Sequence, residues 1–227
     1  MNFSWLMPET ASTFGPAIDS LYYVILWITG IVFFATEITL VVFLVKYRHK
    51  EGRKAAYIHG SNQAEVIWTI TTFLIVMGLA IYSKGLWDEI RGPAAIPANA
   101  MTIDVLAKQF EWNATYPGPD GQLGTGDDFV SRNVLHIPVD QPVRVNLQAE
   151  DVIHSFFLPE FRVKQDAVPG MNIPVWFEAT RTGEFTLACA ELCGLGHYRM
   201  KGSITVHSQA EFDAWLAGQQ ANGEDDQ

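Results

Sequence analysis

The residues best suited to chemistry lie in one short stretch near the end of the 227-residue chain. The only two cysteines, Cys189 and Cys193, are followed by His197 and Met200 in the pattern C-x3-C-x3-H-x2-M, and His154 lies upstream. Thiolate, imidazole and thioether are the ligands that copper takes in electron-transfer sites. A mononuclear site of this kind uses one Cys. The second Cys therefore favours a centre in which two thiolates bridge two copper ions.

Two other chemistries fit part of this pattern. A disulfide between Cys189 and Cys193 is feasible in an extracytoplasmic domain if the loop brings the two side chains within bridging distance. It would leave both histidines and Met200 unexplained. A zinc ion could take both thiolates and both imidazoles, but it has little use for a thioether. Copper is thus the favoured interpretation, with these two as alternatives.

The stretch also resembles the binuclear CuA loop of subunit II of haem–copper (aa3/caa3-type) cytochrome c oxidases. In that family the two thiolates bridge the coppers, the two imidazoles are terminal ligands, and the thioether and one backbone carbonyl each bind one copper weakly. The carbonyl is that of Glu191, whose carboxylate is also implied to bind a magnesium or manganese ion shared with subunit I. The resemblance implies the copper ligands His154, Cys189, Glu191, Cys193, His197 and Met200.

Two apolar runs predict a membrane hairpin. Residues 20–45 and 65–87 are each long enough to cross a hydrocarbon core of ~30 Å as a helix. The connecting segment, 46–64, begins with five of the fifteen basic residues, which predicts a cytoplasmic loop. Both termini are then expected on the outer side. Residues 1–19 lack the basic start of a signal peptide and are expected to be an extracytoplasmic segment.

The remaining chain predicts a β domain. Residues 88–210 contain short segments of alternating apolar and polar residues, separated by turn signals, which favours a sandwich or barrel. Because the metal-ligand pattern precedes the last such segment, we expect a cupredoxin-like Greek-key barrel. Residues 211–227 are expected to form a helix and an acidic tail. Two membrane helices followed by a cupredoxin domain is also the plan of subunit II, so the resemblance covers nearly the whole chain.

The resemblance implies a function as part of a complex. Electrons would arrive from a cytochrome c and leave to haem in subunit I, where oxygen is reduced to water, so no catalytic residue is expected in this chain. The expected partners are subunits I and III, a bacterial inner membrane, and a soluble or membrane-bound c-type cytochrome, held in a supercomplex or separate; no nucleic acid is expected. The absence of a C-x-x-C-H motif argues against a c-type haem on this chain.

Two different functions are the alternatives. A membrane-anchored protein that binds or delivers copper would also carry such ligands, although a delivery site is expected to be exposed and incomplete. A quinol-oxidase-like subunit II has the same helices and barrel but lacks the copper ligands, which are complete here.

Several residues outside the ligand pattern carry separate hypotheses. Glu65 matches the mouth of the family's K pathway for protons, although an acid at a helix start is also favoured by the helix dipole. Phe110 replaces the Trp through which electrons reach the family's centre, so Phe110 and Trp112 are candidate points of electron transfer and the donor is open. Glu37, inside the first apolar run, is expected to contact a partner subunit. Residues 118–128 faintly resemble a calcium loop, but their spacing favours an ordered turn.

The outer part of the chain is acidic. Residues 99–227 hold eighteen Asp and Glu against eight Lys and Arg. Such a field would steer a basic redox protein toward the domain, although for any single residue ordinary solubility is the simpler explanation. The candidates are Glu111, Asp127, Asp128, Asp140, Glu150 and Asp151.

Overall fold

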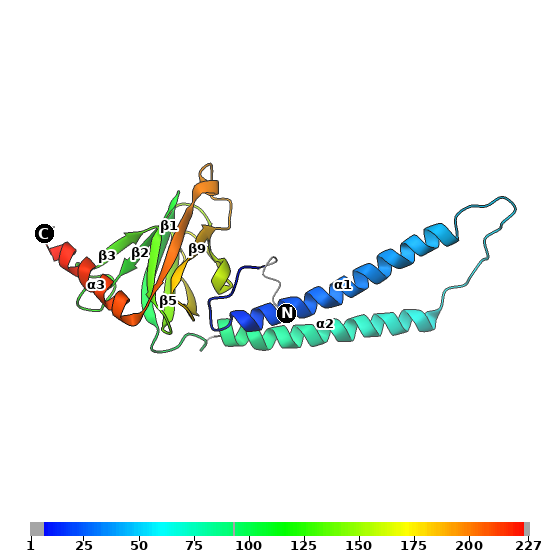
Figure 1. The fold of residues 1–227 in the computed structure, drawn as a ribbon, viewed down its shortest axis with the longest axis horizontal. Coiled ribbons are helices and arrows are strands. Elements are labelled where there is room, and N and C mark those ends of the chain that lie inside the picture. The colour runs from blue at the N-terminus through cyan, green and yellow to red at the C-terminus, as the bar shows by residue number, and fades with distance from the viewer. Residues whose placement is uncertain (1–6, 93, 225–227) are drawn as a thin grey trace. The chain divides into compact units, whose positions relative to one another are not determined.

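A computed structural model describes residues 7–92 and 94–224 of the chain, with side chains described as far as residue 219. The chain divides into two units, a helical one spanning 17–92 and a β domain that also includes the chain before residue 17. Figure 1 shows the two long helices of the first unit and the strands of the second.

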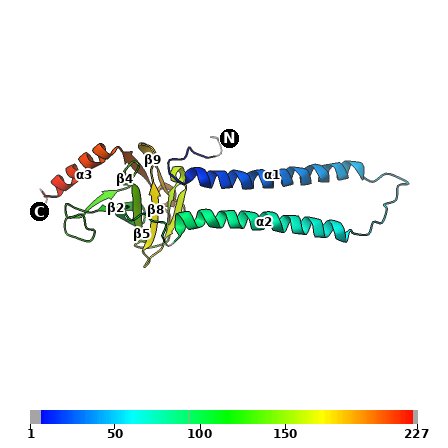
Figure 2. The same ribbon diagram turned by 90° about the horizontal axis from the view of Figure 1, so that it is seen from below.

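The helical unit is a hairpin of two apolar helices. Helix α1 spans Gly15–Lys46 and helix α2 spans Asn62–Arg91, so both extend beyond the predicted apolar runs. Both are long and apolar enough to cross a membrane. Figure 2 shows them running antiparallel and joined by an extended loop. Nearly all their apolar side chains are exposed, and this surface needs lipid or partner helices to cover it.

The β domain consists of two five-stranded sheets. One has the order β3-β2-β1-β5-β8 and the other β4-β10-β9-β6-β7. Pairs β1–β5 and β4–β10 are parallel, and the other pairs are antiparallel. The strands are β1 Met101–Lys108, β2 Glu111–Tyr116, β3 Phe129–Arg132, β4 Val134–Pro138, β5 Pro142–Ala149, β6 His154–Leu158, β7 Val163–Ala167, β8 Ile173–Glu178, β9 Gly183–Cys189 and β10 Lys201–His207.

Alternation along the strands places the core between the sheets. In β1, for example, Ile103, Val105 and Ala107 are buried while the residues between them are partly exposed, as expected when successive side chains point to opposite faces. Two 3-10 turns, η1 Pro159–Phe161 and η2 His197–Arg199, lie in the connections. The two-sheet domain confirms the all-β prediction.

The chain before α1 is part of the β domain. Ala11 N donates to Glu160 O at 2.7 Å, and Thr180 N donates back to Ala11 O at 2.9 Å. Ser12 is buried, and its hydroxyl donates to the carbonyl of Phe161 at 2.7 Å. Residues 7–14, which we call the N-terminal strap, were not predicted to pack on the β domain because the segment is too short to show a strand period. Its contacts put the described start of the chain on the same side of the membrane as the β domain.

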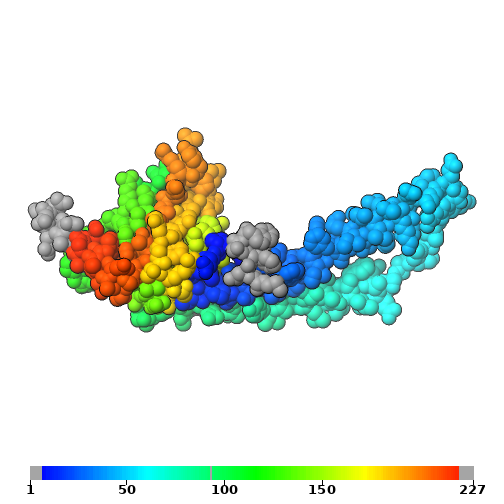
Figure 3. Space-filling model, in the orientation of Figure 1, coloured from blue at the N-terminus to red at the C-terminus, as the bar shows by residue number. Residues whose placement is uncertain are grey.

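Helix α3, Gln209–Glu224, covers strands β3, β4 and β10, as Figure 3 shows where its red surface lies against the domain. The contact is aromatic: the Trp215 ring stacks on His136 with centroids 4.2 Å apart. His136 Nδ1 lies 2.8 Å from His207 Nε2, so one imidazole donates to the other. Burial, reinforced by His207, lowers the pKa of His136 to about 4.

This histidine predicts acid sensitivity. Because the pKa of His136 in the fold lies below the value of about 6.5 expected in the unfolded chain, the unfolded chain takes up more protons between those values. The stability is fully present above about pH 6.5 and is lost as the pH falls toward about 4. We expect the unfolding temperature of the β domain to drop over this window, and His136→Phe to reduce the drop.

The control is His49→Phe, in the exposed loop between the membrane helices, which should leave the acid-induced drop unchanged. Thermal unfolding of the full chain in detergent, followed at several pH values, measures both. An equal drop in His136→Phe and the unsubstituted chain would contradict the assignment.

Candidate metal centre

The predicted ligands come from two regions of one sheet. His154 is the first residue of β6 and Cys189 the last of β9. These strands are antiparallel neighbours, with Phe156 paired to Cys189. The other ligands follow in the loop that leads from β9 to β10, which projects from one end of the domain in Figure 1. The register of β6 on β9 therefore brings a histidine distant in sequence to the cysteine loop.

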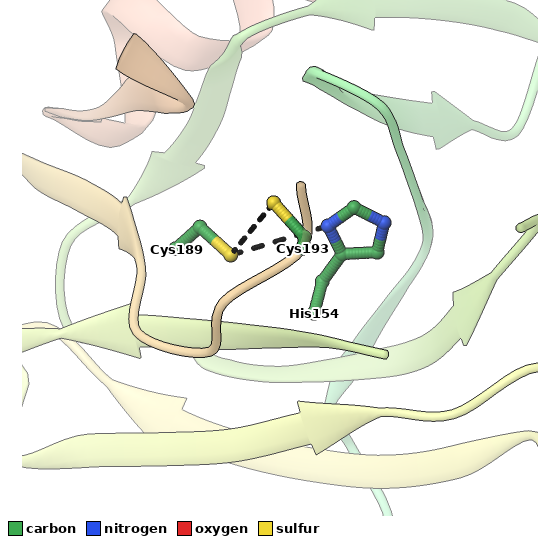
Figure 4. Close-up of side chains that lie close together, drawn as sticks. All are labelled: His154, Cys189 and Cys193. Carbon is green, nitrogen blue, oxygen red and sulfur yellow. Dashed lines mark hydrogen bonds between the residues drawn. The ribbon is translucent and has the colours of Figure 1, made fainter. Parts of the chain in front are cut away.

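The sulfur atoms lie at the centre of this cluster. Cys189 Sγ is 3.8 Å from Cys193 Sγ, which in turn is 3.7 Å from Met200 Sδ. Both cysteines are free thiols. Cys189 Sγ also lies 3.2 Å from the backbone carbonyl of Glu191. Figure 4 shows the Cys189 sulfur directed toward the Cys193 sulfur and the ring nitrogen of His154.

Both imidazoles direct Nδ1 toward the sulfurs. His154 Nδ1 lies 3.9 Å from Cys189 Sγ and 3.2 Å from Met200 Sδ. His197 Nδ1 lies 3.7 Å from Cys193 Sγ. The donors therefore form two groups. His154 and Met200 lie together in one group, and the His197 imidazole lies against the Cys193 thiol in the other.

This donor set fits a copper centre. A metal–thiolate bond is about 2.3 Å long, so two sulfurs 3.8 Å apart can both bind one ion and share a second. The ligand atoms of His154, Cys189 and Cys193 all lie within 4.8 Å of one another. A thioether and a carbonyl as additional weak donors suit copper better than zinc. His154, Cys193 and Met200 are buried, whereas Cys189 and His197 are partly exposed.

A carboxylate orients one of the imidazoles. His154 Nε2 donates to Asp151 Oδ1 at 2.8 Å, leaving Nδ1 for the metal. Burial alone would raise the pKa of Asp151, but hydrogen bonds from His154, Gln109 and Val152 hold that pKa below its usual range. Such a partner fixes the tautomer and direction of a ligating imidazole. From the sequence alone Asp151 is predicted only as part of the acidic surface, although an Asp three residues before a predicted ligand His is a usable signal for this role.

Metal binding must displace a proton from the buried thiol. Burial, followed by the neighbouring Cys189, raises the pKa of Cys193 to about 11. The metal-free thiol is therefore protonated at neutral pH, whereas the ligand is the thiolate. Loading the site must release protons and is favoured as the pH rises.

Comparison with known proteins identifies the family. The family model described as "Cytochrome C oxidase subunit II, periplasmic domain" matches residues 101–208, and the model for the transmembrane domain matches 1–86. The chain belongs to the cytochrome c oxidase subunit II family. Its two membrane helices and its cupredoxin-like β domain are those of a subunit II, as the sequence predicted.

Curated relatives cover nearly the whole chain. An alternative cytochrome c oxidase subunit 2 of Bradyrhizobium diazoefficiens is 35% identical over 95% of this chain and 84% of its own length. A cytochrome c oxidase subunit 2 of Thermostichus vulcanus is 30% identical, over 95% and 79%. The crystal structure of the periplasmic domain of a Bradyrhizobium japonicum subunit II is 34% identical and covers 56% of this chain and 98% of its own, with a TM-score of 0.49.

The other predicted site residues lie apart from this cluster or at its edge. Glu191 lies in the ligand loop, between the two cysteines, and its side chain is exposed. Glu65 lies in the first turn of α2, after the N-cap Ser61, and Glu37 is exposed on α1. Their assigned roles stay predictions.

The two aromatic candidates for electron transfer differ in position. Phe110 is half-buried beside the ligand loop. Trp112 is only 2% exposed, and its ring packs edge-on against His154 and Phe156. The burial of Trp112 favours a packing role, and its part in electron transfer stays a prediction.

The acidic surface is smaller than the sequence indicated. Glu111 is nearly buried and forms ion pairs with Lys108 and Arg132, so its charge is neutralised. The carboxylates of residues 118–128 accept hydrogen bonds inside their own loop, mainly from Thr125 and backbone amides. These contacts agree with the ordered turn that the spacing favoured.

Proposed function

We propose that this chain is the electron-accepting subunit of a terminal respiratory oxidase. In this proposal a binuclear copper centre receives electrons from a cytochrome c and passes them to haem in subunit I, where oxygen is reduced to water. The convergence of two thiols, two imidazole Nδ1 atoms, a thioether and a backbone carbonyl carries the proposal. Membership of the subunit II family supports it.

The chain's own residues would make the site suited to rapid one-electron transfer. Two copper ions held here would share one unpaired electron through the bridging thiolates. Cys189 is the last residue of β9 and His154 is the first residue of the neighbouring strand β6. The sheet therefore fixes the positions of both residues. A rigid frame limits the movement of ligands between oxidation states, and the burial of Cys193 and Met200 limits the reorientation of water.

The orientation and the partners follow from the same proposal. The β domain and both termini would lie on the periplasmic side of a bacterial inner membrane, which the basic residues of the 46–64 loop and the contacts of the N-terminal strap support. Subunits I and III would cover the apolar helix surfaces. The exposed carboxylate of Glu191 would bind a magnesium or manganese ion shared with subunit I.

A copper-delivery function is less well supported. Release of copper to a client requires that the client's ligands reach the metal. His154, Cys193 and Met200 are all buried, and His154 is held from behind by Asp151. The burial of these three donors favours retention of the metal.

Electron-spin resonance of the copper-loaded full chain in detergent tests the proposal. We expect two coppers per chain and a spectrum in which one unpaired electron is shared by two copper nuclei. Metal analysis on the same sample gives the stoichiometry. A spectrum from a single copper nucleus, or a site that takes one zinc ion and rejects copper, would overturn the binuclear assignment.

Glu65 is proposed as the mouth of the proton pathway into subunit I. Its position in the first turn of α2 leaves the side chain exposed at the end of the helix. We expect Glu65→Gln to lower turnover of the assembled oxidase and change its pH profile. Glu51→Gln, in the basic loop, is the control and should leave both unchanged. Normal turnover across pH with normal assembly would leave Glu65 only its role beside the helix dipole.

A further inference from the structure

The turn that joins β1 to β2 touches both halves of the metal-ligand set. It consists of Gln109 and Phe110, between the paired residues Lys108 and Glu111. No role in metal binding follows from the ligand pattern for either residue, because both lie far from the cysteines in sequence. Their contacts give them one.

Gln109 makes two hydrogen bonds that reach opposite sides of the site. Its side-chain Nε2 donates to the backbone carbonyl of Cys193 at 2.6 Å. Its backbone N donates to Asp151 Oδ2 at 2.8 Å, while the other oxygen of Asp151 accepts from His154 Nε2. One residue therefore connects the backbone of the ligand loop at Cys193, through Asp151, to the imidazole of β6.

Phe110 packs against the glycines on either side of Leu195. A Cβ atom added at Gly196 would lie 2.5 Å from the Phe110 ring, well inside contact distance. One added at Gly194 would lie 2.7 Å from Gln109 Nε2, and Gly194 also has a φ of +130°. The guanidinium of Arg199 lies over the same ring, 5.9 Å from its centre.

The turn is itself held firmly. Glu111, next to Phe110, forms ion pairs with Lys108 and Arg132, and Trp112 anchors the following strand in the core. The backbone N of Trp112 donates to Asn133 Oδ1 at 2.9 Å. A fixed turn that packs against the two glycines of the ligand loop restricts how that loop moves.

We propose that Gln109 and Phe110 form a clamp that holds the ligand loop in its metal-binding conformation. Gln109 fixes Cys193 and, through Asp151, the direction of His154. The Phe110 ring occupies the space that a side chain at position 196 would need, and it therefore sets how closely the loop can approach the turn. Both are positioning residues, since neither offers an atom to the metal. The clamp rests on the copper site proposed above.

The rate at which a chelator removes copper from the full chain tests the hydrogen bond. Outer partners of metal ligands typically contribute about 10–100-fold to metal affinity, and we expect Gln109→Met to accelerate copper loss by about that factor. Gln141→Met is the matched control, because Gln141 Nε2 makes the same kind of bond, to Asn99 O at 2.8 Å, away from the site. Equal rates in the two variants would overturn the role of Gln109.

The packing contact is tested by a double substitution. Gly196→Ala should accelerate copper loss in the unsubstituted background and have little further effect when combined with Phe110→Ala, because removing the ring removes the clash. Gly194→Ala should not be relieved in this way, since its backbone conformation remains strained. An equal effect of Gly196→Ala in both backgrounds would overturn the role of Phe110.

Two further measurements separate the possible failures. If the unsubstituted chain failed to bind two coppers, the copper proposal would fail; if it bound two and the clamp variants kept them as firmly, only the clamp would fail. Where Phe110→Ala does not fold, Phe110→Leu provides a smaller truncation. The copper hyperfine pattern should change in Gln109→Met and stay native in Gln141→Met, which a general loss of stability would not produce.

Discussion

Replacing Cys189 or Cys193 with serine will abolish the proposed binuclear copper centre. The two sulfurs are 3.8 Å apart and lie between the other donors, so each thiolate would serve both metal positions. A serine hydroxyl does not ionise at neutral pH and is a poor ligand for copper, which prefers soft sulfur donors. We expect at most one copper per chain, a changed absorption spectrum, and complete loss of electron transfer from a reduced cytochrome c.

The control variant is Ser203→Ala, on β10 shortly after the ligand loop. It alters a side chain about as small as that of cysteine, but one outside the donor set. Metal analysis, spectroscopy and stopped-flow reduction of the copper-loaded full chain measure the outcome. Retention of the native two-copper spectrum in either cysteine variant would show that the thiolates do not bridge.

Features that depend on residues close together in the sequence could be predicted, whereas contacts between distant segments could not. Five of the six proposed ligands lie within residues 189–200, so the residue types and spacing of this stretch already favoured copper. The membrane helices follow from apolar runs, and many strands from alternation. Strand β6 was not predicted, because His154 to Leu158 is almost wholly buried and shows no alternation.

The roles of the remaining residues depend on contacts between distant segments. Gln109 bonds to a residue 84 positions away, and no periodicity indicates such a contact. The burial of Glu111 depends on ion pairs with Lys108 and with Arg132 from the neighbouring strand. Because the sequence does not reveal these partners, it predicted Glu111 as part of the acidic surface. The positions that sequence patterning left open are those whose role depends on which strand lies beside them.

Truncating Trp112 will both destabilise the β domain and loosen the metal site. The indole is buried between the sheets and packs edge-on against His154 and Phe156. Removing a buried Trp side chain typically costs about 3–5 kcal/mol of unfolding free energy, because a cavity remains. In Trp112→Ala this cavity would lie beside His154, a proposed copper ligand. We therefore expect a lower unfolding free energy in denaturant and faster loss of copper to a chelator.

Trp112→Phe separates packing from electron transfer. The indole Nε1 is buried and has no hydrogen-bond partner among the described residues, so replacing it with a phenyl ring sacrifices no hydrogen bond and leaves a smaller cavity. If Trp112 acts through packing, this variant will keep most of the stability and the native rate of copper reduction by a cytochrome c. A stable Trp112→Phe chain with a native copper spectrum but slow reduction would instead make the indole part of the electron path, despite its burial beneath the surface.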